Sequence, residues 1–251
     1  MRLFFLALSF LTTLPVKAPA KPGDLARATR WFPLVGGVIG VLLVTTDLVT
    51  RLVFPLPVRS VIILFVAWLL TGGLHLDGLA DTFDGLAAGG DRERALRVMR
   101  DSRIGSAGAT ALLLTLLLKL GALLELEGEA RSLALVMGPV VGRQAMVIML
   151  SAYPYARENG LAGSFRQGKG ELPKSFLLTA CLSLVVWCLW GGGGGLLVSV
   201  AVALSGAWLL GWFIARRIGG MTGDTCGAVG ELAEALWLLA VTACRGAWTM
   251  G

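Results

Sequence analysis

Long apolar runs alternate with short polar segments along most of this chain. A helix needs about 20 apolar residues to cross a bilayer, and seven runs approach that length: 32–50, 60–76, 105–124, 132–151, 175–191, 197–215 and 228–244. Several runs are short and the fifth ends in glycines, so six to eight spans fit the pattern. It predicts an all-α, polytopic transmembrane helical bundle of about seven spans. Because the spans and their loops account for residues 1–251, we expect a single integral-membrane domain.

Composition and charge support this class and suggest an orientation. Only 15% of the 251 residues are charged, whereas an ordinary soluble domain has roughly 25%. The net charge of +6 comes from Lys and Arg in alternate loops, which is typical of membrane orientation rather than of nucleic-acid binding. We therefore expect the N-terminus and the basic loops on the cytoplasmic side of the cell (inner) membrane. The basic loops hold Arg2, Lys17, Lys21, Arg27, Arg30, Arg92, Arg94, Arg97, Arg100, Arg103, Arg157, Arg166, Lys169, Lys174, Arg216 and Arg217. The opposite loops hold Arg51, Arg59, Arg131, Arg245 and an acidic turn of Glu125, Glu127 and Glu129.

Three features of the chain suggest packing rather than chemistry. Residues 1–20 resemble a signal peptide in composition, but the basic loop that follows favours a retained amphipathic or partly inserted helix. The four cysteines form no CxxC pair and are expected to be small hydrophobes in the membrane. Two glycine-rich segments, 33–40 and 105–109, are expected to permit close helix packing.

Three aspartates follow directly on the second apolar run. Asp77, Asp81 and Asp84 are spaced i, i+4 and i+7, which places them on one face of a helix. Carboxylates beside hydrocarbon are costly and generally functional. Like charges on one face need a cation between them, and Mg²⁺ with oxygen ligands meets that need. The alternative is a solvated acidic helix end; Asp101 lies further along the chain.

Basic residues come next and suit anionic ligands. Arg97, Arg100 and Arg103 recur every three residues, so they share one helix face toward anions or acidic side chains. Asp91 lies off this stripe and is expected to be a solvated loop acid. The glycine-rich loop 157–170, with Arg157, Arg166 and Lys169, suits phosphate binding through backbone N–H groups and cations. Its alternative is an ordinary positively charged cytoplasmic loop.

Several single residues have open roles. His75, the only histidine, is either a general base or substrate contact, since histidine titrates near neutrality, or a structural residue. Arg143 lies inside a span and needs a partner, expected to be one of the aspartates or a substrate phosphate. Lys119, nearer the outer end of its span, is expected to snorkel.

Acidic residues near the last span also have two readings each. Asp224 is either a metal or hydroxyl ligand, or it forms a helix N-cap at this position or at Thr225. Glu231 and Glu234 are either acids at a helix start or site residues. Polar residues of these segments fall on one side of the membrane, which indicates a cytoplasmic-side active site rather than a pathway across.

These segments resemble the cobalamin synthase family, adenosylcobinamide-GDP ribazoletransferase, over nearly the whole chain. The strongest match is GGLHLDGLADTFDGL (72–86) with MRDSRIGSAGA (99–109). Further matches are FLTTLPV (10–16), FPLVGGVIG (32–40), GRQAMV (142–147), YARENGLAGSF (155–165) and GGMTGDTCGA (219–228). Thr13 is a departure, because the family usually has Arg there.

The resemblance implies a membrane-bound, Mg²⁺-dependent enzyme of late vitamin B12 assembly. Such an enzyme transfers the adenosylcobinamide-phosphate of adenosylcobinamide-GDP to the ribose hydroxyl of α-ribazole or its 5′-phosphate, and it releases GMP. Its expected partners are these substrates, membrane lipid and other cobalamin-assembly enzymes, with no nucleic acid. The implied metal ligands are Asp77, Asp81, Asp84 and Asp101. The implied catalytic residues are His75, Asp77, Asp81 and Asp84. The implied substrate and phosphate contacts are Arg100, Arg103, Arg143, Arg157, Arg166, Lys169 and Asp224.

Other classes of function remain as alternatives. The spacing of Asp81, Asp84, Gly85 and Ala88 is partly that of the CDP-alcohol phosphotransferases, which would act on another substrate, but Gly89 replaces that family's arginine. A transporter would need charges along several helices at mid-depth, and we expect only Arg143 to meet that description. A non-catalytic scaffold would not require the aspartate stripe.

Overall fold

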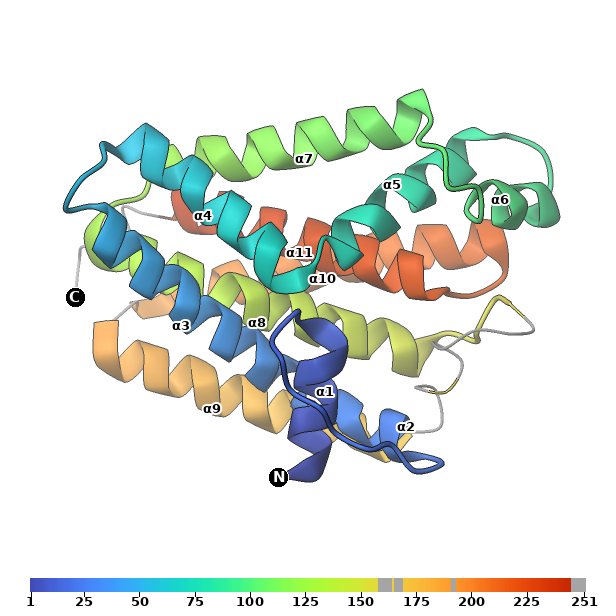
Figure 1. Cartoon of the computed structure of the whole chain (residues 1–251), viewed down its shortest axis with the longest axis horizontal. Helices are drawn as coiled ribbons and strands as arrows, with labels where there is room; N and C mark the ends of the chain where they lie inside the picture. Colours follow the sequence, from blue (N-terminus) through green and yellow to red (C-terminus); the bar gives the residue numbers. More distant parts are fainter. Residues whose placement is uncertain (158–163, 165–168, 191–192, 245–251) are drawn as a thin grey trace.

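The computed structural model describes residues 1–157, 164, 169–190 and 193–244, and this part of the chain is a bundle of helices without strands (Figure 1). The helices are α1 (Arg2–Leu11), α2 (Asp24–Ala28), α3 (Phe32–Thr50), α4 (Leu56–Thr71), α5 (Leu74–Ala87), α6 (Arg92–Val98), α7 (Ser106–Leu124), α8 (Gly128–Ala152), α9 (Leu172–Trp190), α10 (Gly193–Ile218) and α11 (Gly223–Ala243), with short 3₁₀ turns at Thr29–Trp31 and Lys169–Glu171. The predicted all-α class is confirmed.

Six stretches of helix are long and apolar enough to cross a membrane. They are Asp24–Thr50, Ser106–Leu124, Gly128–Ala152, Leu172–Leu189, Gly194–Ile218 and Gly223–Ala243. The α4 and α5 helices pass the same test only as a pair, which would make a seventh. The predicted count of about seven therefore agrees with the six or seven candidate spans among the described residues.

The predicted second span, 60–76, is wrong in its shape. The α4 helix ends at Thr71, and α5 leaves it at an angle of 91°. Gly72 and Gly73 cause this break, because both have left-handed backbone angles, φ 62° and 71°, which glycine adopts without steric cost. The bend gives the aspartate-bearing α5 its own direction, from the middle of the bundle toward α6 (Figure 1).

Helix α8 forms the centre of the bundle, and its neighbours approach it closely. Gly36 and Gly40 of α3 lie against its backbone, where a Cβ on Gly40 would stand 2.5 Å from the carbonyl oxygen of Val136. On another side, the indole of Trp237 in α11 donates to the carbonyl oxygen of Ala134 over 3.0 Å. The predicted packing role of segment 33–40 is confirmed, since small residues are what allow helices to approach this closely.

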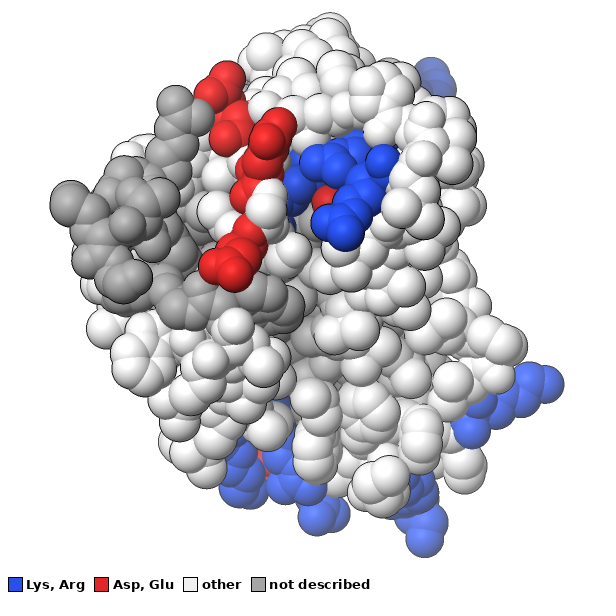
Figure 2. Space-filling model, turned by 90° about the vertical axis from the view of Figure 1, so that its left-hand side faces the viewer, with Lys and Arg blue, Asp and Glu red and all other residues white. Residues whose placement is uncertain are grey.

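The bundle has two ends with different charges. We call the end with α6 and the start of α11 the site end, and the end where α3 and α7 finish the far end (Figure 1). Figure 2 looks onto the far end and shows acidic side chains beside a hollow that holds basic side chains. There the Arg131 guanidinium is buried and pairs with Asp47 over 2.8 Å. An arginine predicted to lie in a loop is thus neutralised inside the bundle, so the far end has less free positive charge than the sequence suggests.

Candidate functional site

Two glycines bring α5 against α11 at the site end. A Cβ on Gly78 of α5 would stand 2.6 Å from the carbonyl oxygen of Asp224, and one on Gly227 would stand 3.2 Å from the Cα of His75. No larger residue fits at Gly78 without moving a backbone. The contact places Asp224 next to the helix face that carries Asp77 and Asp81.

The start of α11 is organised by a capping box. The Thr222 hydroxyl accepts from the Thr225 N–H over 3.2 Å, and the Thr222 N–H donates to the Thr225 hydroxyl over 2.7 Å. The N-cap is therefore Thr222, and the expected cap at Asp224 or Thr225 is wrong by two or three positions. Because Thr222 satisfies the helix end, the Asp224 carboxylate is left for other contacts.

Arg157 supplies one of those contacts. Its guanidinium forms an ion pair with Asp224 at 2.8 Å. The backbone before it is held by a two-way bridge: the Ala156 N–H donates to the Met221 carbonyl, and the Met221 N–H donates to the Pro154 carbonyl, each over 2.8 Å. Two predicted site residues that are 67 positions apart thus meet beside α5.

Asp81 lies among the other carboxylates of this region. It is half-buried, and the carboxylates of Asp77, Asp84 and Asp224 all act on it electrostatically, with Arg157 as the opposing positive charge. One cation near four carboxylates leaves an excess of negative charge. That excess favours binding of a further cation.

Asp84 and Asp101 already have partners. The two Asp84 oxygens accept the N–H groups of Gly105, over 2.7 Å, and of Gly108, over 2.8 Å, at the start of α7. Asp101 accepts from the guanidinium of Arg103 over 2.6 and 3.0 Å. These hydrogen bonds hold the pKa of the Asp101 carboxyl down at about 2. Their roles as metal ligands stay predictions. Across the described residues, no three His, Cys, Asp or Glu side chains converge as they would around a bound metal.

A cavity of about 900 Å³ opens between the α4–α5 bend, the segment after α6 and α7. Its polar lining contains five predicted site residues: Asp77, Asp81, Arg100, Asp101 and Arg103. Its apolar lining includes Phe10, Trp68, Leu74, Leu76, Ile104, Leu112 and Leu116. We call this the α5 cavity; it offers charged and apolar walls to one ligand.

A second cavity of about 710 Å³ lies beside α6, and we call it the α6 cavity. It is lined by Asp91, Arg92, Glu93, Leu96, Arg100, Ala156 and Arg157. Arg100 lines both cavities, so they adjoin at its side chain. Arg92 is a lining residue that was not predicted from the sequence, although its place in the same basic run as Arg100 is a signal. Its guanidinium donates to the Ala156 carbonyl over 2.7 Å.

His75 lies apart from both cavities. Its side chain is buried against Gly227, and it is not among the residues that line either cavity. The charges that act on it are those of Arg143, Glu234 and Lys119. The role of His75 as a general base stays a prediction, and this placement favours its structural alternative.

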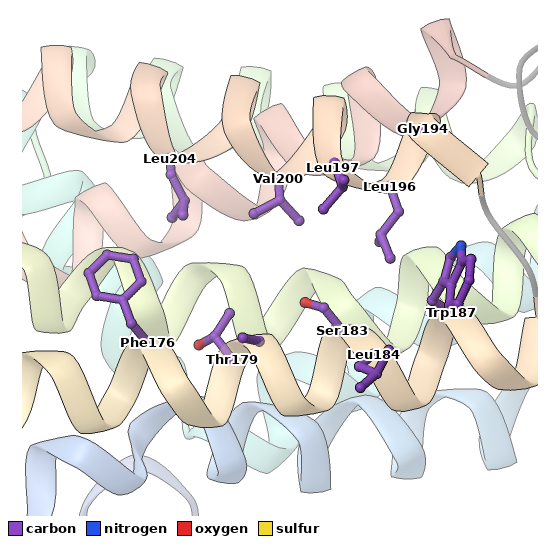
Figure 3. A pocket seen from close by; sticks show the side chains of 11 residues that line it. Phe176, Thr179, Ser183, Leu184, Trp187, Gly194, Leu196, Leu197, Val200 and Leu204 are labelled. Carbon is purple, nitrogen blue, oxygen red and sulfur yellow. The ribbon is translucent and has the colours of Figure 1, made fainter.

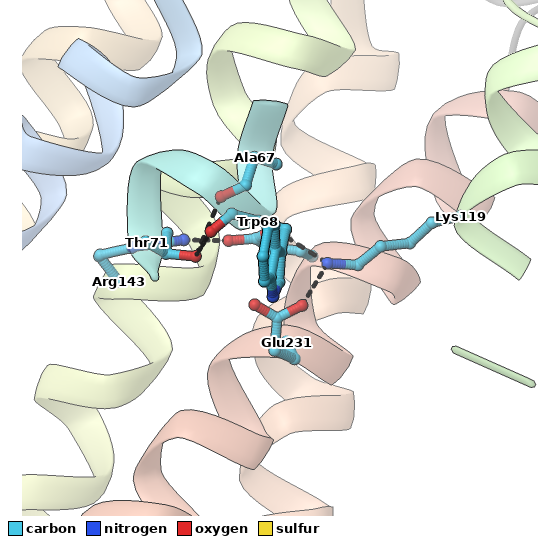
Figure 4. A network of polar contacts seen from close by, with 7 residues as sticks. Ala67, Trp68, Thr71, Lys119, Arg143 and Glu231 are labelled. Atoms are coloured by element: carbon cyan, nitrogen blue, oxygen red, sulfur yellow. Dashed lines mark hydrogen bonds and ion pairs between the residues drawn. The ribbon is translucent and has the colours of Figure 1, made fainter. Parts of the chain in front are cut away.

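Those charges form an ionic network inside the bundle. Lys119 of α7 contacts Glu231 at 2.5 Å and Glu234 at 3.1 Å, and Arg143 of α8 pairs with Glu234. In Figure 4 the Lys119 side chain reaches Glu231 across a space that Trp68, Thr71 and Arg143 also border. Two cations and two anions cancel here.

The network corrects three expectations. Arg143 is paired with a glutamate and not with an aspartate, Lys119 is buried and does not snorkel, and Arg143 is not the only charge at mid-depth. The enclosed space measures only about 30 Å³, which is room for about one water molecule. The sequence signal was the glutamate pair in the last span, which supplies the two anions that two intramembrane cations need.

Part of the predicted phosphate-binding loop cannot be placed. Arg166 and most of loop 157–170 lie outside the described residues, as does the side chain of Lys169.

A further cavity of about 760 Å³ separates α9 from α10, and Figure 3 shows apolar side chains such as Phe176, Trp187 and Leu196 around it. None of its described lining residues is charged, so it does not suit a phosphate.

Comparisons with known proteins agree with the resemblance drawn from the motifs. The sequence model of a family described as "Cobalamin-5-phosphate synthase" matches residues 3–242. Three similar curated proteins are all named adenosylcobinamide-GDP ribazoletransferase. The one from Desulforamulus reducens is 40% identical and aligns over 93% of each chain. The one from Geotalea daltonii is 38% identical over 98% of this chain and 99% of its own. The one from Pseudomonas putida KT2440 is 39% identical over 92% and 94%. No solved structure matches this chain. With nearly its whole length matched, the chain belongs to the cobalamin-5-phosphate synthase family.

Proposed function

We propose that this protein is an Mg²⁺-dependent adenosylcobinamide-GDP ribazoletransferase. The adenosylcobinamide-phosphate group of adenosylcobinamide-GDP would pass to the ribose hydroxyl of α-ribazole or its 5′-phosphate, with release of GMP. Family membership and the names of the relatives support this reaction. The observation that carries the proposal is that Asp77, Asp81, Arg100 and Arg157 line two adjoining cavities, with Asp224 paired to Arg157 beside them.

The reaction places specific demands on such a site. Substitution at a pyrophosphate phosphorus develops negative charge on the bridging and terminal oxygens, and fixed positive groups lower its energy. Arg100 and Arg103 line the α5 cavity and can contact these oxygens. The attacking hydroxyl must also lose a proton. Asp77 and Asp81 line the same cavity, which makes an aspartate a better placed acceptor than His75.

We assign the magnesium ion to Asp77 and Asp81, with Asp224 beside them. Mg²⁺ binds through one or two carboxylates together with substrate phosphates and water, and this donor set has that chemistry. In the described part of the chain, no hydrogen bond or ion pair occupies the carboxylates of Asp77 and Asp81. When bound, the ion would neutralise charge on the pyrophosphate oxygens. Asp84 and Asp101 already accept hydrogen bonds from Gly105, Gly108 and Arg103, so fewer of their lone pairs are left for a metal.

The site end is proposed to face the cytoplasm. Arg92, Arg94, Arg97, Arg216 and Arg217 are exposed there, whereas Arg131 at the far end is buried with Asp47. Exposed positive charge on one side of a membrane protein marks its cytoplasmic face.

The function is tested with purified protein in lipid nanodiscs, adenosylcobinamide-GDP, α-ribazole and saturating Mg²⁺. We expect metal-dependent GMP release that Asp81→Asn reduces at least about 100-fold, the scale of losing one transition-state interaction. Glu129→Gln removes one exposed acid at the far end and should keep full activity. Full activity of Asp81→Asn would remove the metal assignment, and no GMP from the unaltered protein would remove the function. Substrate uptake into vesicles without chemistry would instead support a transporter.

A further inference from the structure

The two cavities at the site end differ in charge. Three arginines line the α6 cavity, and its two acids are engaged elsewhere: Asp91 accepts the Arg94 N–H over 2.9 Å, and Glu93 pairs with Arg97 at 3.9 Å. The α5 cavity instead has three aspartates, two arginines and a larger apolar lining.

Donor groups in the α6 cavity are left for a ligand. The Nε atom of Arg157 is buried and makes no hydrogen bond within the described structure, while its Nη2 atom pairs with Asp224 at 2.8 Å. Arg100 is exposed at the junction of the two cavities. Guanidinium groups in this state suit the oxygens of a phosphate, which they can bind through two N–H groups at once.

The geometry of phosphoryl transfer separates the two reactants. The attacking and leaving oxygens lie roughly in line on opposite sides of the reacting phosphorus. Two cavities that adjoin at one basic residue suit this arrangement, with the nucleophile in one and the leaving nucleotide in the other. The α5 and α6 cavities meet at Arg100, and each has the volume of a small-molecule site, about 300–1,000 Å³.

We propose that the α6 cavity binds the guanylate half of the nucleotide substrate and that the α5 cavity binds the ribazole nucleophile. This inference rests on the proposed function. The departing GMP carries its phosphate toward Arg92 and Arg157, while the aromatic base of ribazole packs on the apolar wall near Trp68 and Ile104. Arg100 contacts the pyrophosphate between them. The bond between the cobinamide-side phosphorus and the bridging oxygen breaks, and GMP leaves with the electron pair. The ribose oxygen bonds to that phosphorus, and its proton passes to an aspartate of the α5 cavity.

The test measures binding of GMP itself to the full-length protein in nanodiscs, without turnover. We expect Arg100→Gln and Arg92→Gln each to raise the Kd of GMP about tenfold, the effect of about 1.4 kcal/mol. Arg100→Gln is the safer variant for folding, because Arg92 also holds the Ala156 carbonyl. Arg94→Gln is the matched control: it removes the same charge from an exposed position of the same helix but lines neither cavity. It should leave GMP binding unchanged.

Steady-state kinetics then separate the compartments. Arg92→Gln should raise the KM for adenosylcobinamide-GDP and the Ki of GMP together, with the KM for α-ribazole unchanged. Ile104→Trp, which narrows the α5 cavity, should raise the KM for α-ribazole and leave the Kd of GMP alone. If Arg94→Gln weakens GMP binding as much as Arg92→Gln and Arg100→Gln do, GMP is attracted only by the overall positive charge of this end, and the inference is overturned. Loss of GMP binding in Ile104→Trp but not in the Arg92 and Arg100 variants would overturn it as well. If the unaltered protein releases GMP normally but the variants affect the two substrates in the opposite way, the assignment of the α5 and α6 cavities is refuted and the proposed function stands. If the unaltered protein shows no turnover, the proposed function itself is refuted.

Discussion

At the scale of single residues, Asp84 joins the aspartate helix to its neighbour. Its carboxylate accepts two N–H groups from the first turn of α7 and the residue before it. A helix N-terminus favours negative charge, because its N–H groups are unpaired and its dipole is positive there. Gly105 and Gly108 leave no room for a side chain beside that carboxylate. Asp84 therefore fixes α5 against α7, whereas Asp81 one turn earlier faces the α5 cavity.

We predict that Asp84→Asn and Asp81→Asn fail in different ways. Asn at position 84 keeps one acceptor but turns an NH₂ group toward a backbone N–H, so the free energy of unfolding should fall by about 1–3 kcal/mol. Asp81→Asn should lose activity with an unchanged thermal midpoint. Thermal unfolding in detergent, measured beside GMP release, compares the two. If Asp84→Asn unfolds at the same temperature as the unaltered protein yet loses all activity, Asp84 is a metal ligand and not a structural link between α5 and α7.

Residue spacing predicted part of this site and could not predict the rest. The period of a helix placed Asp77, Asp81 and Asp84 on one face without any structure. It gave no neighbour for that face, so the meeting of Asp81 with Asp224 and Arg157 came only from the packing of α5 on α11. In the same way, hydropathy required partners for Arg143 and Lys119 but did not say that Glu231 and Glu234 would supply them.

At the scale of elements, the α4–α5 bend sets where the aspartates lie. Hydropathy runs through Gly72 and Gly73 without a break, so the sequence pattern joined the two helices into one span. The structure turns them by 91° because both glycines adopt left-handed angles. A Cβ on Gly73 would also stand 2.7 Å from the indole nitrogen of Trp68, a wall of the α5 cavity.

We predict that Gly73→Ala destabilises the protein and lowers its activity. The left-handed angle costs a non-glycine residue about 1–2 kcal/mol, and the collision with Trp68 adds to that cost and moves α5. Gly128→Ala is the matched control, because Gly128 has φ 55° with nothing within 4 Å of its Cβ position. Thermal unfolding and GMP release are measured for both. An equal loss of stability with full activity in each variant would show that Trp68 yields freely and that the bend does not depend on Gly73.

The buried ionic network ties α7, α8 and α11 together, and we predict that its charges act as one unit. Glu234→Gln leaves Arg143 without its partner, so the free energy of unfolding should fall by about 3–5 kcal/mol. Adding Arg143→Met removes the stranded cation and leaves the Lys119–Glu231 pair balanced, so more than half of the loss should return. Unfolding of the two single variants and the double variant forms a double-mutant cycle. Additive losses would mean that Arg143 and Glu234 act independently.

At the scale of the whole molecule, the described helices run between the two ends of the bundle seven times when the bent α4–α5 pair is counted as one passage. Helix α3 finishes near the start of α8, as the Asp47–Arg131 pair shows, and α7 begins beside Asp84 at the other end. The bent α4–α5 pair must therefore bring the chain back from the far end to the site end. An odd number of passages places the start of α3 and the end of α11 on opposite sides. Every predicted site residue in a described loop or helix start then lies on one side.

We predict that this side is the cytoplasm, and two engineered cysteines can test it. In a variant without Cys181, Cys188, Cys226 and Cys244, Ala20→Cys marks the site end and Glu127→Cys marks the far end, and both positions are exposed. A membrane-impermeant maleimide added to spheroplasts should label Glu127→Cys at once and Ala20→Cys only after the membrane is permeabilised. The physical reason is the exposed positive charge of the site end, which resists transfer across the membrane. The reverse labelling order would place the α5 and α6 cavities outside the cell, away from any cytoplasmic nucleotide, and would contradict the proposed reaction. If both positions are labelled in intact spheroplasts, they lie on the same side of the membrane, and the chain does not cross the bilayer an odd number of times between them.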